Sequence, residues 1–231
     1  MNIKNQIPNL FTLGNLFCGF LSIGYAANHQ YTNAAVLILI GMMLDSMDGR
    51  IARMLHAETP LGKELDSLAD IVTFGVAPSF LVYYTIFFNN GLLGLAISGL
   101  FPLFGAYRLA RFNTAPEDES STHFTGVPIT AAGGILALLT LFNNQIPSIV
   151  TTVIFTALSF LMVSKLKIPS LKEVPLPKYG TIVTIFLGAL LVIVNIESYG
   201  RFPYLIYIAT PIYIIYVAYW FIKVKGNKGK G

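Results

Sequence analysis

Long apolar runs alternate with short polar links along the whole chain. The runs approach the roughly 20 mostly apolar residues that a helix needs to cross the hydrocarbon core of a bilayer. They also lack the alternation of apolar and polar residues that indicates a strand. The pattern therefore predicts an all-α, polytopic membrane helix bundle with about eight transmembrane helices. We place them at about 10–27, 32–54, 70–88, 91–109, 127–142, 147–164, 179–195 and 203–222.

The composition supports a membrane protein over a soluble one. Hydrophobic residues make up 55% of the 231 residues and charged residues only 11%, whereas about a quarter of the residues of a soluble domain are charged. The mean hydropathy is +0.67. We find no separate soluble domain, so we expect residues 1–231 to form a single integral membrane domain.

The positions of lysine and arginine predict the orientation, because basic residues collect in cytoplasmic loops. With the N-terminus inside, alternate links place fourteen of the fifteen basic residues on the cytoplasmic side, and only Arg201 falls outside. Both termini are then cytoplasmic, in a multi-pass protein of the cell membrane. This topology and contact with anionic headgroups account for the net charge of +4, which therefore indicates no nucleic-acid partner.

Four aspartates stand in the segment 44–75, "LDSMDGRIARMLHAETPLGKELDSLADIVTFG", among residues suited to a bilayer. Asp45 and Asp48 are three apart near the inner end of the second run, and Asp66 and Asp70 are four apart at the inner start of the third. These spacings place each pair on one face of a helix. We therefore expect two helix ends to present four carboxylates toward each other at the cytoplasmic membrane surface.

Four neighbouring carboxylates repel one another unless positive charge lies among them. Arg50, Arg53 and Lys63 could supply it as a structural cluster, but Gly49 and Ala52 on the same face leave open space that packing would fill. A set of oxygen ligands favours a hard cation such as Mg²⁺, Mn²⁺ or Ca²⁺ over Zn²⁺. Two such ions could bridge a diphosphate. The pattern therefore predicts a divalent metal site.

Residues 45–70 read D-x2-D-G-x2-A-R-x8-G-x3-D-x3-D. This run resembles the signature of the CDP-alcohol phosphatidyltransferases, membrane enzymes that use divalent metals to displace CMP from a CDP-linked lipid with an alcohol. The resemblance implies a site with two Mg²⁺ or Mn²⁺ ions at the cytoplasmic face. It implies that Asp45, Asp48 and Asp66 are metal ligands, and that Asp70 binds the second metal and is the catalytic base.

The same resemblance implies residues that contact the CDP-lipid. Glycine and alanine of the signature would let the cytidine diphosphate approach the backbone, and Arg53 would hold a phosphate. Thr12 and Asn15 share a face of the first run and either face the nucleotide or pack between helices, and Asn9 is expected to cap that helix after Pro8. The expected CDP-lipid contacts are Gly49, Ala52, Arg53, Gly62, Thr12 and Asn15.

Other segments between roughly residues 7 and 130 resemble the serine-using subgroup of this family from Gram-positive bacteria and archaea. They are "IPNLFTLGNLFCGFLSI", "FGVAPSFLVY", "YRLARFN" and "FTGVPI". This implies transfer of a phosphatidyl group from CDP-diacylglycerol to L-serine, giving phosphatidylserine and CMP, in a homodimer. Glycerophosphate-using relatives carry arginine where this chain has Asn15. Glycerol 3-phosphate, inositol phosphate or an archaeal ether lipid remain alternative substrates.

Arg108 and Arg111 are candidates for binding the acceptor, since arginine matches carboxylates with bidentate hydrogen bonds. Both could instead be basic residues that only set the membrane orientation, with their side chains extending to the lipid headgroups. Lys63 either binds acceptor or donor phosphate or is exposed to solvent. A transporter is the rival class, because acids within a membrane often mark a transport path. Here the acids gather at one edge instead of following a path across, which favours the enzyme.

Overall fold

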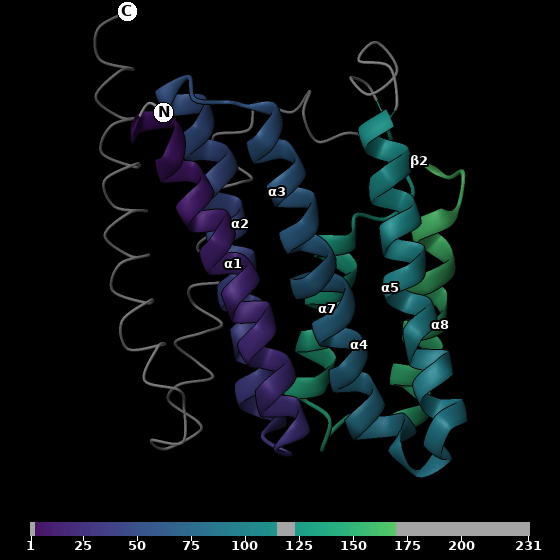
Figure 1. Cartoon of the computed structure of the whole chain (residues 1–231). Coiled ribbons are helices and arrows are strands. Elements are labelled where there is room, and N and C mark those ends of the chain that lie inside the picture. The colour runs from purple at the N-terminus through teal and green to yellow at the C-terminus, as the bar shows by residue number, and fades with distance from the viewer. Residues whose placement is uncertain (1–2, 115–122, 170–231) are drawn as a thin grey trace, which may run out of the picture. The chain divides into compact units, whose positions relative to one another are not determined.

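The computed structural model describes residues 3–114 and 123–169 (Figure 1). All described elements belong to one compact unit within residues 1–170. The runs expected at 179–195 and 203–222, and the C-terminal tail, lie outside the described residues. The expectation of a single domain over the whole chain therefore stays a prediction.

The described part of the chain is helical, as the apolar runs predicted. The helices are α1 Ile3–Ala27, α2 Tyr31–Leu55, α3 Pro60–Asp70, the π-helix η1 Ile71–Val76, α4 Ala77–Val82, the π-helix η2 Tyr83–Phe87, the 3₁₀-helix η3 Phe88–Asn90, α5 Gly91–Thr114, α7 Ile129–Leu141 and α8 Ser148–Val163. Two short strands, β1 His123–Thr125 and β2 Lys167–Pro169, pair antiparallel.

Two helical stretches of the described residues are long and apolar enough to cross a membrane, Gln6–Ala27 and the 55-residue stretch Pro60–Thr114. The second stretch contains two predicted runs, because helix continues through their link while the chain reverses direction. Gly91 stands at this reversal with φ 54°, a left-handed value that favours glycine. Figure 1 shows α4, before the turn, side by side with α5, after it. The total of about eight spans and the side of each terminus stay predictions.

Local sequence explains how α2 and α3 are joined. His56 ends α2 in the left-handed conformation, with φ 51°. Thr59 caps the start of α3, where its side chain accepts a hydrogen bond from the Gly62 N–H at 3.0 Å. Pro60 occupies the first turn, where no backbone N–H is needed. This short link returns the chain so that α3 begins beside the end of α2.

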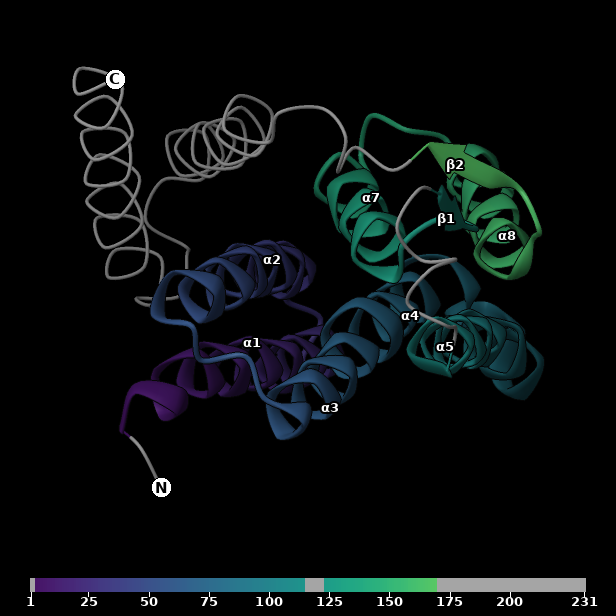
Figure 2. The same cartoon turned by 90° about the horizontal axis from the view of Figure 1, so that it is seen from above.

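Helix α1 packs along both α2 and α3, and Figure 2 shows these three helices grouped on one side of α4. Helices α5, α7 and α8 lie on the other side. The centre of the described part is apolar, with Leu37 of α2, Phe74 of η1, Phe101 of α5 and Phe155 of α8 fully or almost fully buried. The π-helix η1 contacts α1, α2, α5 and α7 and so lies at the middle of the packing.

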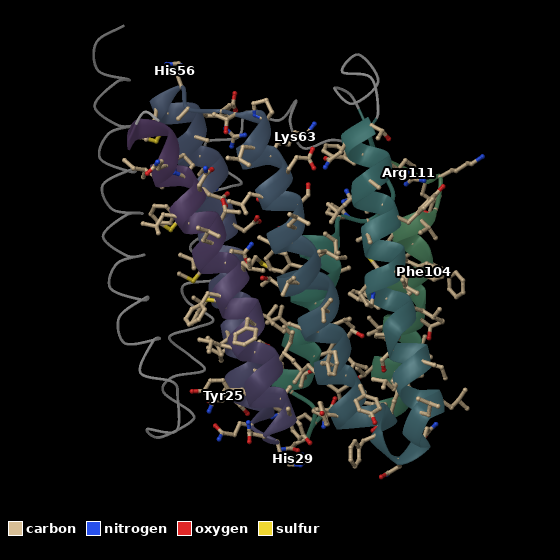
Figure 3. All side chains as sticks on the ribbon, in the orientation of Figure 1. Tyr25, His29, His56, Lys63, Phe104 and Arg111 are labelled. Atoms are coloured by element: carbon tan, nitrogen blue, oxygen red, sulfur yellow. The ribbon has the colours of Figure 1, made fainter. Side chains whose placement is uncertain are left out.

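The end of the unit that carries the α2–α3 link lies opposite the end that carries the α1–α2 link. Figure 3 labels His56 and Lys63 at the first end, and Tyr25 and His29 at the other. The aspartates of α2 precede His56, and those of α3 follow Lys63. They are therefore gathered toward the first end of the bundle.

Candidate active site

The structure brings carboxylates of α2 and α3 together. Asp45, Asp48 and Asp66 each offer an oxygen, and these three oxygens lie within 4.8 Å of one another. Asp45 is also close enough to interact with both Asp66 and Asp70. Asp48 and Asp70 are buried, and Asp45 and Asp66 are half-buried. The helical spacing thus produces a four-aspartate cluster between two helices, as expected from sequence.

This cluster fits a hard divalent cation. Oxygen ligands lie about 2.0–2.1 Å from Mg²⁺, so two of them on one ion are at most about 4.2 Å apart. The observed oxygens need only a small inward movement to meet that limit. Asp66 Oδ1 and Asp70 Oδ1 are buried and have no hydrogen-bond partner among the described residues. Because buried polar atoms are normally paired, these oxygens have the character of ligand atoms.

Helix α1 holds one of the carboxylates in place. The Thr12 hydroxyl donates a hydrogen bond to Asp48 Oδ2 at 2.7 Å, and it also lies 3.2 Å from the Pro8 carbonyl oxygen. The Gly49 N–H donates to Asp48 Oδ1. Sequence reasoning expected Thr12 to face the nucleotide or to pack between helices. The structure adds a third role, because Thr12 orients Asp48.

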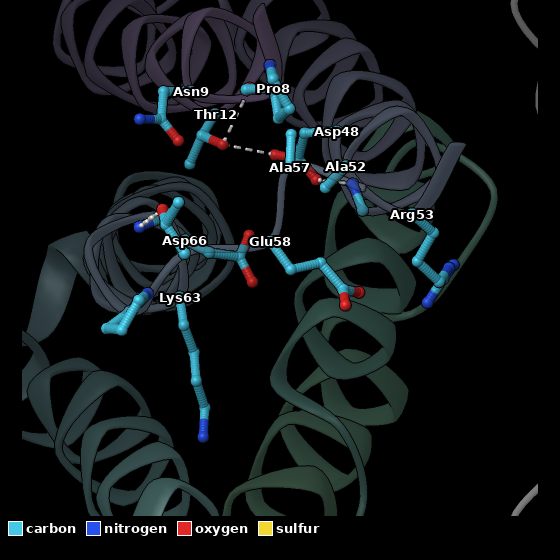
Figure 4. A pocket seen from close by; sticks show the side chains of 14 residues that line it. Pro8, Asn9, Thr12, Asp48, Ala52, Arg53, Ala57, Glu58, Lys63 and Asp66 are labelled. Atoms are coloured by element: carbon cyan, nitrogen blue, oxygen red, sulfur yellow. Dashed lines mark hydrogen bonds between the residues drawn. The ribbon is translucent and has the colours of Figure 1, made fainter. Parts of the chain in front are cut away.

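A cavity of about 570 Å³ opens beside the cluster, between α1, the end of α2 and the start of α3 (Figure 4). This volume is typical of small-molecule sites. Five of the six expected CDP-lipid contacts line the cavity: Thr12, Gly49, Ala52, Arg53 and Gly62. An added Cβ at Gly49 would meet no described atom within 4 Å, so this glycine leaves room at the wall of the cavity.

The rim of the cavity holds charged side chains. Arg53, Glu58 and Lys63 are exposed there, and Figure 4 shows the Arg53 and Lys63 side chains reaching outward. Asn9 also lines the cavity. The expectation that Asn9 caps the first helix is wrong, since α1 begins at Ile3 and contains Pro8 within it. A helix can include proline in its early turns, and sequence alone did not reveal where this one starts.

Asn15 does not line the cavity. Its side chain is fully buried, and neither Nδ2 nor Oδ1 has a hydrogen-bond partner among the described residues. Its backbone oxygen accepts a hydrogen bond from the Thr73 hydroxyl at 2.9 Å, and its Oδ1 lies beside Gly41 of α2. Of the two roles left open by the sequence, the structure therefore favours packing between helices, in place of contact with the nucleotide.

The side chains of the two arginines near the end of α5 have different partners. Arg108 is buried, interacts electrostatically with Asp70, and stands 6.0 Å from the centroid of the Phe112 ring. Its Nε has no hydrogen-bond partner among the described residues. Arg111 instead points its guanidinium at the carbonyl oxygens of Val163 and Ser164, where α8 ends. Arg108 is therefore near enough to Asp70 to influence it electrostatically, whereas Arg111 contacts the end of α8.

Asn113 was not singled out from the sequence. Its Nδ2 donates a hydrogen bond to Ser67 Oγ at 2.9 Å and so joins the end of α5 to α3 beside Asp66. The signal in the sequence is weak, because both are ordinary polar residues near helix ends. Only the antiparallel return of α5 along α3 brings them together.

Comparison with known proteins agrees with the geometry of this site. The family model described as CDP-alcohol phosphatidyltransferase matches residues 5–163, which include the aspartates, the cavity and Arg108. The chain belongs to this family of metal-dependent membrane enzymes. The resemblance noted in residues 45–70 is thereby confirmed.

Individual relatives carry more specific names. A CDP-diacylglycerol–serine O-phosphatidyltransferase of Helicobacter pylori is 38% identical over 96% of this chain and 95% of its own length. The protein of the same name from Bacillus subtilis is 40% identical over 73% of this chain and 93% of its own length. An archaetidylserine synthase of Methanothermobacter thermautotrophicus is 32% identical, over 71% of this chain and 69% of its own length.

Proposed function

We propose that this protein transfers the phosphatidyl group of CDP-diacylglycerol to the hydroxyl of L-serine, giving phosphatidylserine and CMP. The names of the Helicobacter and Bacillus relatives support this acceptor. The observation that carries the reaction type is the cluster of Asp45, Asp48 and Asp66, of which Asp48 and Asp66 line a cavity large enough for a nucleotide.

The donor fits the cavity by its chemistry. The cytidine diphosphate part requires polar surroundings, and the cavity supplies Asn9, Thr12 and charged groups at its rim. Gly49 leaves space for close approach of the ligand to the backbone, Ala52 adds only a methyl group to the wall, and Gly62 adds no side chain. Arg53 is exposed at the rim, and in this proposal it contacts a phosphate. The acyl chains would extend from this end of the helices into the membrane.

Asp45, Asp48, Asp66 and Asp70 would hold Mg²⁺ or Mn²⁺, with two ions per site. When bound, divalent metal neutralises the diphosphate and stabilises charge on the departing phosphate. Thr12 contributes by orienting Asp48 toward the cluster. Asp45 lies near both aspartates of α3, so it joins the two halves of the ligand set.

In this proposal Asp70 takes a proton from the acceptor. It is buried beside Arg108, and its Oδ1 has no partner among the described residues. The serine hydroxyl is a weak nucleophile without a base. In the overall transfer, the serine oxygen forms the new bond to the phosphorus of the phosphatidyl group. The bond from this phosphorus to the CMP oxygen breaks, and the hydroxyl proton goes to Asp70.

In this proposal Arg108 binds the carboxylate of serine. It brings a positive charge into a buried position near Asp70, and its Nε is available as a donor. A guanidinium matches a carboxylate with two parallel hydrogen bonds. Arg111 is directed to α8 instead, so it would support the fold in this region. Lys63 lines the exposed rim of the cavity, where it could contact a donor phosphate.

The proposal includes the arrangement in the membrane. About eight transmembrane helices, with both termini and the cavity at the cytoplasmic face, agree with the distribution of lysine and arginine. A homodimer is proposed from the family resemblance. In this orientation the donor's nucleotide and free serine reach the site from the cytoplasm, while the acyl chains stay in the bilayer.

An acceptor panel tests the function. The purified full-length protein is given CDP-diacylglycerol with L-serine, glycerol 3-phosphate, inositol phosphate or water, and the lipid products are identified by mass. We expect CMP release and phosphatidylserine with serine. A product with another acceptor, and none with serine, would refute the acceptor. The same panel with a CDP-linked ether lipid tests the donor suggested by the archaetidylserine synthase.

A further inference from the structure

Thr73 lies in a notch between α1 and α2, three residues after Asp70, and is fully buried. A Cβ added to Gly19 of α1 would lie 2.5 Å from Thr73 Oγ1 and 2.8 Å from its Cα. A Cβ added to Gly41 of α2 would lie 2.6 Å from Thr73 Cγ2. Real Cβ atoms do not approach this closely, so both helices need glycine where Thr73 enters.

The two ends of the threonine side chain contact different helices. The hydroxyl donates to the Asn15 carbonyl oxygen of α1 at 2.9 Å, whereas the methyl group is turned toward Gly41 of α2. Thr73 belongs to the π-helical turn that starts directly after Asp70. π-Helical turns are rare in proteins, and those that occur are often found at functional sites. The helix that carries Asp66 and Asp70 is therefore attached to both neighbouring helices at one residue.

This attachment lies about one helical turn from Asp45 on α2 and from Asp70 on α3, and about two turns from Asp48 and Asp66. Gly41 precedes Asp45 by four residues on α2, and Thr73 follows Asp70 by three. One turn of an α-helix rises about 5.4 Å. A displacement at the notch therefore reaches the aspartates almost undiminished. Catalytic and metal-binding groups need placement to within about 0.5 Å, which is less than the displacement that an added methyl group would demand.

We propose that Thr73 is a positioning residue. By fitting between Gly19 and Gly41, it sets the depth and rotation of α3 and η1 against α1 and α2, and thus the spacing between Asp66/Asp70 and Asp45/Asp48. This inference rests on the metal site of the proposed function. Neither Thr73 nor the two glycines lines the cavity, so the effect on the metal passes through the aspartates.

The test is Mn²⁺ binding to the full-length protein in detergent, measured by electron paramagnetic resonance, together with the thermal unfolding midpoint. Gly41→Ala is expected to weaken Mn²⁺ affinity by about tenfold or more, as changes behind metal ligands commonly do. Gly24→Ala on α1 and Gly99→Ala on α5 are matched controls, since an added Cβ meets no described atom within 4 Å. They should bind Mn²⁺ within about twofold of wild type.

Rescue gives the sharper outcome. Thr73→Ser removes Cγ2, which at 2.6 Å is the nearest atom to a Cβ at Gly41, whereas Asn15 Oδ1 stays at 2.8 Å, so it should restore part of the Mn²⁺ affinity of the Gly41→Ala protein. It should not restore Gly19→Ala, whose Cβ meets Oγ1 and the backbone Cα instead. A folded Gly41→Ala protein with wild-type affinity would overturn the inference. Equal rescue of both glycine variants, or rescue of neither, would also overturn it.

Two further proteins complete the design. Thr73→Val keeps the shape of the side chain but removes its hydroxyl. It is the test variant to use if Gly41→Ala does not fold. A severalfold loss of Mn²⁺ affinity supports the inference, and unchanged affinity overturns it.

Asp45→Asn separates this inference from the proposed metal site. If wild type and Asp45→Asn bind Mn²⁺ equally, the metal site itself is wrong. If only Asp45→Asn is impaired while the folded Gly41→Ala and Thr73→Val proteins bind normally, only the role of Thr73 is refuted.

Discussion

The hydrogen bond from Thr12 to Asp48 allows a quantitative prediction about the metal site. Thr12→Val replaces the hydroxyl by a methyl group of similar size, so packing in this buried position is largely kept. Asp48 Oδ2 then loses a donor at 2.7 Å. Loss of a group that orients a metal ligand commonly costs about 10- to 100-fold in metal affinity, which corresponds to roughly 1.4–2.8 kcal/mol. We expect Mn²⁺ affinity to fall by this factor.

A matched control isolates the contact with the carboxylate. Thr140 of α7 is also buried, and among the residues that the structure describes its hydroxyl donates only to the Leu136 carbonyl four residues earlier, at 3.0 Å. Thr140→Val therefore removes a helix-internal hydrogen bond like that of Thr12 to Pro8, but no contact with an acid. Its Mn²⁺ affinity should stay within about twofold of wild type. Thr12→Ser keeps the donor and should also bind nearly normally.

The assay is Mn²⁺ titration by electron paramagnetic resonance, with CMP release from CDP-diacylglycerol measured at saturating metal. If Thr12 acts only by orienting Asp48, excess metal should recover most of the turnover of Thr12→Val. Unchanged Mn²⁺ affinity in Thr12→Val would refute the reasoning. An equal loss in Thr140→Val would also refute it, because the effect would then come from general weakening of the bundle.

Four other predictions follow from the site. Asp70→Asn should lower turnover by roughly 10²–10⁴-fold, with less loss of CDP-lipid affinity than Asp45→Asn; near wild-type turnover would exclude the base. Excess EDTA should abolish CMP release, and Mg²⁺ or Mn²⁺ should restore it; full activity in metal-free protein would contradict this. Arg108→Gln should raise the serine KM about tenfold or more, whereas Arg111→Gln should mainly lower the unfolding midpoint; the reverse result would exchange their roles. A cysteine at Glu58, in a background without the native cysteine, should react with an impermeant thiol reagent only after permeabilisation; labelling in intact cells would reverse the orientation.

Much of this protein could be predicted from local sequence, because its strongest signals are periodic. The length of the apolar runs predicts helices, since backbone polar groups in lipid must be paired within the segment. Spacings of three and four place Asp45 with Asp48 and Asp66 with Asp70 on helix faces. The family signature over residues 45–70 depends on the same spacings. Each of these features requires only the geometry of one helix or its immediate link.

Which side chains meet between helices could not be predicted from the sequence and was shown only by the tertiary structure. Thr12 and Asn15 share a face of α1, yet Thr12 contacts Asp48 while Asn15 is buried beside Gly41. Arg108 and Arg111 are three residues apart on α5, yet Arg108 interacts with Asp70 while Arg111 contacts carbonyl oxygens at the end of α8. Helical period places such residues near one another, but it does not say which neighbour each will meet.

The physical reason is that the depth and rotation of each helix depend on close packing with several others. Thr73 enters α1 and α2 only because Gly19 and Gly41 lack side chains at those points. The π-helical turn after Asp70 adds a local change of helical geometry that the apolar pattern does not reveal. The sequence by itself thus determined that two helix ends would carry the four aspartates. Packing around Thr73, between residues far apart in the chain, decided how closely those ends meet.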